Sequence, residues 1–97
     1  MEPSKEADIV RRKGESLQIE RMYERAIICY NRATKLDPKG PNAYFKNSHA
    51  LRELGKKEEA IDYCQQVIIR DPSYRNAYFL KGIALEDLAR NQEAVDC

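Results

Sequence analysis

The sequence contains few of the residue types that carry chemistry. It has no tryptophan, one histidine (His49) and three cysteines (Cys29, Cys64 and Cys97). The cysteines are odd in number and form no CxxC pair, so neither a disulfide framework nor a zinc site is predicted. The sequence also lacks a glycine-rich phosphate loop and the HExxH and GxSxG motifs. We therefore expect no enzymatic activity, no cofactor and no metal site.

Long apolar runs and an excess of charge of one sign are also absent. No apolar run approaches the roughly 20 residues that a membrane span needs. Residues 1–13 are heavily charged and lack the apolar stretch of a signal peptide. The formal net charge of +1 gives no bulk attraction to nucleic acid or to an acidic membrane. These absences predict a soluble, intracellular, cytoplasmic protein with no nucleic-acid or membrane partner.

What the sequence does contain is an internal repeat of 34 residues. Asp37-Pro38 recurs as Asp71-Pro72, and the tetrapeptide NAYF occupies residues 42–45 and again 76–79. Alanine occupies the same place in three successive units, at positions 26, 60 and 94. A fixed period of this size is typical of a stacked array, because one unit cannot bury its apolar face alone.

Apolar and small residues within each unit follow helical spacing. We expect helices over residues 6–20, 23–36, 41–54, 57–70, 74–88 and 91–97, with Gly55 ending the third. Large and small residues alternate on the facing stripes, so that one helix can approach its partner closely. The predicted stripes are Val10, Gly14 and Leu17; Ala26, Tyr30 and Ala33; Tyr44, Ser48 and Leu51; Ala60, Cys64 and Val67; Tyr78, Gly82 and Leu85; and Ala94.

These residues and their spacing resemble the tetratricopeptide repeat family. The resemblance implies an all-α superhelix, a solenoid of antiparallel helix pairs with a right-handed twist. One domain, residues 1–97, would hold two full repeats (7–40 and 41–74) and a truncated third (75–97). The chain departs from the family pattern at Lys13, Asn47 and Lys81, where an apolar residue is usual.

The resemblance also implies a concave surface, made by the first helix of each repeat, that binds an extended or helical peptide. Phe45 and Phe79 follow Tyr44 and Tyr78, so on a helix they point about 100° away from the core stripe. Each phenylalanine is a candidate anchor for a partner. Alternatively, Phe45 packs against the next repeat and Phe79 is buried by a segment absent from this chain. The predicted contacts are Arg11, Asn42, Phe45, Lys46, His49, Asn76 and Phe79.

One subtype of the family clamps the C-terminal carboxylate of chaperone tails with lysine, arginine and asparagine side chains. The matching residues here are Arg11, Glu15, Lys46, Asn76 and Leu80. Glu15 would repel a carboxylate and Leu80 offers no donor, so a chaperone-tail clamp is not expected.

The third unit stops within its second helix, and this predicts an exposed apolar end. We expect this end to carry Leu80, Ile83 and Leu88, and to serve either as a self-association surface or as the docking face of a longer array. The function favoured by the sequence is a protein–protein interaction module, a scaffold or adaptor that holds a peptide in its groove. The alternatives are a self-associating structural fragment and a regulatory segment of a larger enzyme.

Overall fold

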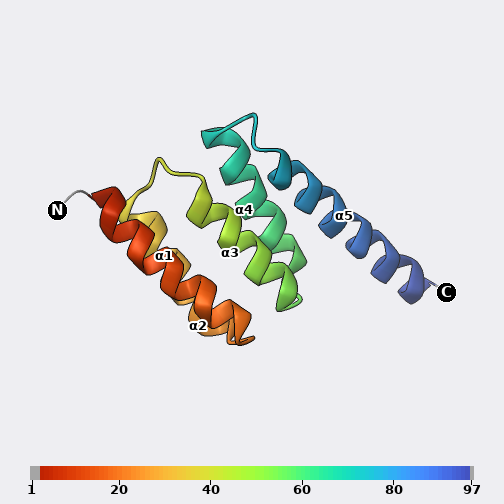
Figure 1. Ribbon diagram of the computed structural model, residues 1–97. Helices are drawn as coiled ribbons and strands as arrows, with labels where there is room; N and C mark the ends of the chain where they lie inside the picture. Colours follow the sequence, from red (N-terminus) through yellow and green to blue (C-terminus); the bar gives the residue numbers. More distant parts are fainter. Residues whose placement is uncertain (1–2, 97) are drawn as a thin grey trace.

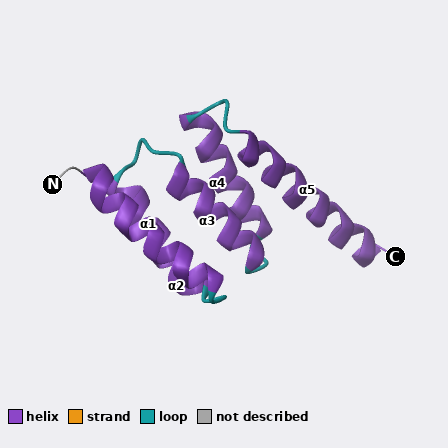
Figure 2. Cartoon of the chain, viewed as in Figure 1, coloured by secondary structure: helices purple, strands orange, loops and turns teal. Residues whose placement is uncertain are grey.

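The computed structural model describes residues 3–96, with side chains from residue 5 to residue 92. It contains five helices: α1 (Pro3–Ile19), α2 (Tyr23–Leu36), α3 (Asn42–Glu53), α4 (Lys57–Arg70) and α5 (Arg75–Asp96). Figures 1 and 2 show that short loops join them and that no strand occurs in the described part of the chain. The all-α prediction is therefore confirmed. Cys97 and the side chain of Ala94 lie outside the described residues.

The helices form two layers. Figure 1 looks onto α1, α3 and α5, with α2 and α4 behind them. α1 packs on α2 and α3 on α4 within each repeat, while α2 packs on α3 between repeats. The molecule is elongated, 55 × 30 × 17 Å, as a stacked array requires. Among the described helices, none combines the length and apolar character needed to cross a bilayer.

The first two helix pairs turn in the same way. Arg21 (φ 64°) and Gly55 (φ 91°) adopt left-handed backbone conformations just after α1 and α3. Met22 N donates to Leu17 O and Lys56 N donates to Leu51 O, both at 2.9 Å. These bonds reach back five residues and satisfy carbonyls at the helix end, as in a Schellman motif. The prediction that Gly55 ends a helix is confirmed.

The third unit has no such turn. The prediction of separate helices over residues 74–88 and 91–97 is wrong, because α5 runs unbroken from Arg75 to Asp96. The position equivalent to Arg21 and Gly55 is Ala89, which has a Cβ atom and a high helix propensity. Without a left-handed residue there the helix continues, and its last turns project beyond the α3–α4 turn (Figure 1).

The core of the first two repeats follows the predicted stripes. Tyr30 of α2 is fully buried, and its ring lies over Gly14 of α1. A Cβ atom built on Gly14 would stand 2.6 Å from Tyr30 Cε1, so only glycine allows this approach. In the second repeat Ser48, Cys64 and Val67 are fully buried. Large side chains therefore cover small ones, as the alternation predicts.

Polar contacts join the two complete repeats. Asn47 of α3 is fully buried and donates to Asn31 Oδ1 of α2 at 2.7 Å. Tyr63 of α4 donates to the same oxygen at 3.2 Å. Asn31 Oδ1 of α2 therefore joins α2, α3 and α4 by accepting both bonds, and Asn47, which breaks the apolar pattern of its position, supplies one of the two donors.

The corresponding stripe of the third unit is exposed to solvent. Tyr78 and Leu85 are each 49% exposed, and a Cβ atom on Gly82 would meet nothing within 4 Å. Leu80 is only 5% exposed and Ala84 is fully buried. The prediction that Leu80 lies at the open end is thus wrong. It is on the side of α5 that packs against α4 and α3.

Candidate functional site

An open pocket of about 440 Å³ lies between α1 and α3 in the front layer. Two of the predicted contact residues, Lys46 and His49, line it from α3. Ile19 lines it from the end of α1 and is 83% exposed, the largest exposure of any bulky apolar side chain described. The remaining lining residues are Glu15, Gln18 and Glu53.

A chain of hydrogen bonds holds His49 in a defined orientation. Tyr30 donates to Gln18 Oε1 at 2.7 Å, so the amide nitrogen of Gln18 faces His49 Nδ1, also at 2.7 Å. Because an amide nitrogen can only donate, Nδ1 accepts and the hydrogen of the ring lies on Nε2. Nε2 in turn lies 3.3 Å from Glu53 Oε1. Burial of the Tyr30 side chain, with the nearby Glu15 carboxylate, raises the pKa of its hydroxyl and keeps it a donor.

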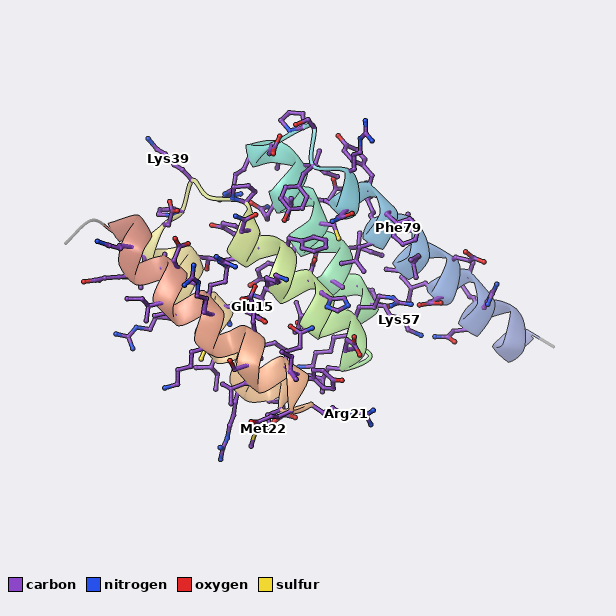
Figure 3. The ribbon with its side chains drawn as sticks, viewed as in Figure 1. Glu15, Arg21, Met22, Lys39, Lys57 and Phe79 are labelled. Carbon is purple, nitrogen blue, oxygen red and sulfur yellow. The ribbon has the colours of Figure 1, made fainter. Side chains whose placement is uncertain are left out.

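The cations of the groove are neutralised by the groove's own carboxylates. Glu15 Oε1 lies 2.9 Å from Arg11 Nη1 and 3.3 Å from Lys46 Nζ. Arg11 Nη2 also lies 3.5 Å from Asp8. Figure 3 shows Glu15 in the space between α1 and α3. A ligand carboxylate would have to compete with Glu15 for both cations.

A further ion pair joins α3 to α5. Arg52 Nη2 lies 3.1 Å from Asp87 Oδ2, and both side chains are about one third exposed. This contact bridges the front-layer helices of the second and third repeats. It removes another cation from the set available to an acidic ligand.

The other predicted contacts fall into two places. The ring of Phe45 lies 5.2 Å from that of Tyr74, centroid to centroid, so it packs against the residue that immediately precedes α5. Asn42 Oδ1 accepts a hydrogen bond from Tyr74 Oη at 3.1 Å. Asn76 is exposed, and Phe79 is 71% exposed on α5 (Figure 3). The structure therefore pairs Arg11 and Lys46 with Glu15, places His49 in the same pocket, and holds Asn42 and Phe45 at Tyr74.

Four pocket residues were not among the predicted contacts: Glu15, Gln18, Ile19 and Glu53. Their helical spacing could have identified them. Gln18 and Ile19 lie three and four residues after Glu15, and Glu53 lies four residues after His49. Residues at these spacings share one face of a helix, so all of them face the same groove.

A stack of antiparallel helix pairs with a period of 34 residues defines a tetratricopeptide repeat domain, a class of protein-interaction module. A family model confirms this class. Residues 20–97 match the model described as "Anaphase-promoting complex, cyclosome, subunit 3". The chain belongs to this family of tetratricopeptide repeat proteins.

Solved tetratricopeptide domains are similar over nearly the whole chain. The first such domain of Spaghetti (RPAP3), bound to the HSP90 peptide SRMEEVD, is 28% identical with a TM-score of 0.87, covering 94% of this chain and 72% of that one. The second domain of human RPAP3, in complex with the HSP70 peptide SGPTIEEVD, is 33% identical with a TM-score of 0.86, covering 95% and 77%. The OM64 domain of Arabidopsis is 25% identical with a TM-score of 0.86, covering 95% and 76%.

Proposed function

We propose that this module binds a protein partner through a peptide segment held in the groove of α1 and α3, and so acts as a scaffold or adaptor. One observation carries the proposal: Ile19 stands exposed in a pocket whose other walls are polar and charged. Binding sites commonly combine an apolar contact with a few oriented polar groups. The hydrogen-bonded His49 and Gln18 are such groups, because their positions are set before a ligand arrives.

The charges of the pocket indicate which peptides fit. Glu15 and Glu53 supply two carboxylates, and Lys46 supplies the only lysine or arginine among the lining residues. Lys46 is already paired with Glu15. A peptide with an apolar side chain against Ile19 and a basic group near Glu53 complements this arrangement. An acidic tail does not, because binding it would require breaking the existing ion pairs.

The peptides bound by the similar domains end in EEVD, which places several carboxylates together. Here Glu15 occupies a clamp position, and Leu80, another clamp position, is buried and nonpolar. We therefore propose that this chain selects a different class of peptide from those relatives.

The test is selection of random dodecapeptides displayed on phage against the purified chain, followed by calorimetry with the selected peptides. Ile19→Glu places a charge in the pocket and should weaken binding at least tenfold. Ile69→Glu is the matched control, because Ile69 is 71% exposed on α4 and lines no part of the pocket. Equal binding by the two variants would contradict the placement of the site.

The peptide SRMEEVD forms the second arm of the same experiment. We expect no saturable binding at micromolar concentrations. Glu15→Asn removes the competing carboxylate and should raise the affinity for this peptide. Tight binding of SRMEEVD by the unaltered chain would overturn the proposed selectivity, while leaving the groove itself as the site if Ile19→Glu abolishes it.

A further inference from the structure

The outer side of α2 carries an exposed stripe of three cations and one isoleucine. Ile28 is 68% exposed, although contact with water gives an apolar side chain no stabilisation. The stripe consists of Arg25, Ile28, Arg32 and Lys35, at successive spacings of three, four and three residues. All four are exposed, and none of them lines the pocket between α1 and α3. We call these four residues the α2 stripe.

The exposure of the α2 stripe is a property of its position in the repeat. The equivalent residues of α4, one period of 34 residues later, are Glu59, Asp62, Gln66 and Ile69, and all four are also exposed. α4 packs against both α3 and α5, so this side of the helix stays open even where neighbouring helices are present. The α2 stripe is therefore part of the outer surface of the array.

The cations of the α2 stripe have no carboxylate partner. Among the side chains that the structure describes, no carboxylate oxygen lies within 4 Å of the charged groups of Arg25, Arg32 or Lys35. The groove differs, because Glu15 already neutralises cations there. An acidic partner can form ion pairs with the α2 stripe without breaking existing ones, so the stripe complements a partner that the groove disfavours.

A pocket of about 280 Å³ continues the α2 stripe at the start of the helix. Arg25 belongs to both, and Leu54 lines the pocket from the end of α3. Tyr23 Oη donates to Glu53 Oε2 at 3.2 Å, which ties α2 to α3 beside the pocket. Met22 is 37% exposed in the lining, and methionine adapts to apolar side chains of different shapes. Figure 3 shows Met22 and Arg21, another lining residue, at the end of the α1–α2 pair.

We propose that the α2 stripe and this pocket bind an acidic amphipathic helix of a partner protein. One apolar side chain of the partner enters the pocket, and a second covers Ile28. Carboxylates on the same face of the partner pair with Arg25, Arg32 and Lys35. The stripe is about 15 Å long, or about three turns, so a short helix matches it. The α2 stripe and the groove then prefer partners of opposite charge, and a module occupied at both sites holds two partners together.

The composition of the surface favours a protein over a membrane or a nucleic acid as the occupant. Polybasic segments that bind anionic lipids typically carry about four to eight lysines and arginines, and the α2 stripe has fewer. The net charge of the chain is only +1, which gives little attraction to a polyanion. An exposed isoleucine beside a pocket is instead suited to discrete apolar side chains between the carboxylates of an acidic helix.

Amide chemical-shift mapping by NMR with a synthetic helical peptide tests the proposal. The probe is a peptide of about 16 residues with glutamates and leucines on one face and alanines and glutamines elsewhere. Its addition should shift the amide signals of Met22, Ile28 and Arg32. Two control peptides, one with glutamine for glutamate and one with alanine for leucine, should each bind about tenfold more weakly or less.

Variants of the chain locate the contact. Ile28→Glu should weaken binding of the acidic peptide about tenfold or more, whereas Ile69→Glu, the same change on the outer side of α4, should not. Arg32→Glu should also weaken binding, with Arg75→Glu, exposed at the start of α5, as the matched charge reversal. Circular dichroism establishes that all four variants fold.

Equal binding by Ile28→Glu and Ile69→Glu overturns the proposal, as do shift changes confined to α1 and α3. A glutamine peptide that binds as tightly as the acidic one also overturns it. Sedimentation with phosphatidylserine vesicles without binding of the peptide would identify a membrane as the occupant instead. A doubled mass at sedimentation equilibrium that Ile28→Glu abolishes would identify a second copy, and this result too would overturn the proposal.

Discussion

Gly14 and Gly82 occupy the same position of their repeats, but their surroundings differ. A Cβ atom on Gly14 would stand within 3 Å of two carbons of the Tyr30 ring, whereas one on Gly82 would meet nothing within 4 Å. Both glycines lie inside helices, where alanine is favoured over glycine by about 1 kcal/mol. The intrinsic preference is therefore the same at both sites, and only the packing differs.

Alanine substitution at these two sites should have opposite effects. Gly14→Ala should lower the free energy of unfolding by about 1 kcal/mol or more, because displacing Tyr30 outweighs the gain in helix propensity. Gly82→Ala should raise it by about 1 kcal/mol. Urea denaturation of the two variants and the unaltered chain measures both effects. Stabilisation by both substitutions would mean that Tyr30 moves aside at little cost.

At the scale of the helices, one residue with a left-handed backbone conformation decides whether the chain turns from the first helix of a repeat into the second. Gly55 adopts φ 91° without strain, while Arg21 adopts φ 64° with a side chain attached. Left-handed backbone costs a residue with a Cβ atom about 1–2 kcal/mol. Ala89, the third equivalent, remains helical within α5.

Substitutions at the two turns should again change the unfolding free energy in opposite directions. Gly55→Ala should lower the unfolding free energy by about 1 kcal/mol, because alanine resists the left-handed conformation. Arg21→Gly should raise it slightly, since relief of strain exceeds the added entropy of the unfolded chain. Thermal unfolding followed by circular dichroism at 222 nm tests the pair. Destabilisation by Arg21→Gly would indicate that the arginine side chain stabilises the turn by itself.

At the scale of the whole molecule, stability depends on contacts between repeats. Arg70 of α4 donates to Pro38 O in the loop between α2 and α3, at 2.6 Å, and to Tyr44 Oη of α3 at 2.8 Å. Its guanidinium carbon also lies 3.8 Å from the centroid of the Tyr44 ring. The planar guanidinium makes the stacking and both hydrogen bonds at once, which an ammonium group cannot do.

Arg70→Lys should therefore lower the unfolding free energy by about 1–2 kcal/mol while keeping the charge. Arg25→Lys, at an exposed position of α2, is the matched control and should change little. Urea titrations of the two variants make the comparison. Equal stability would show that the Arg70 contacts contribute nothing between repeats.

The sequence by itself determined the period, the helix pairs of the first two repeats and the stripes that they bury. These features depend on residues close together in the chain: Gly55 at a turn, or Gly14 and Leu17 on one face of a helix. Local spacing and backbone preference are sufficient to predict these features.

Only the tertiary structure decided which side of α5 is buried in the third unit and which side chains pair with one another in the groove. Leu80 is buried and Leu85 half exposed because of where α5 lies against α4 and α3, not because of spacing within α5. Phe45 packs on Tyr74, 29 positions away, and Glu15 of α1 neutralises Lys46 of α3. Such contacts join helices far apart in the chain, and their geometry follows from how whole helices stack, which a pattern within one helix does not contain.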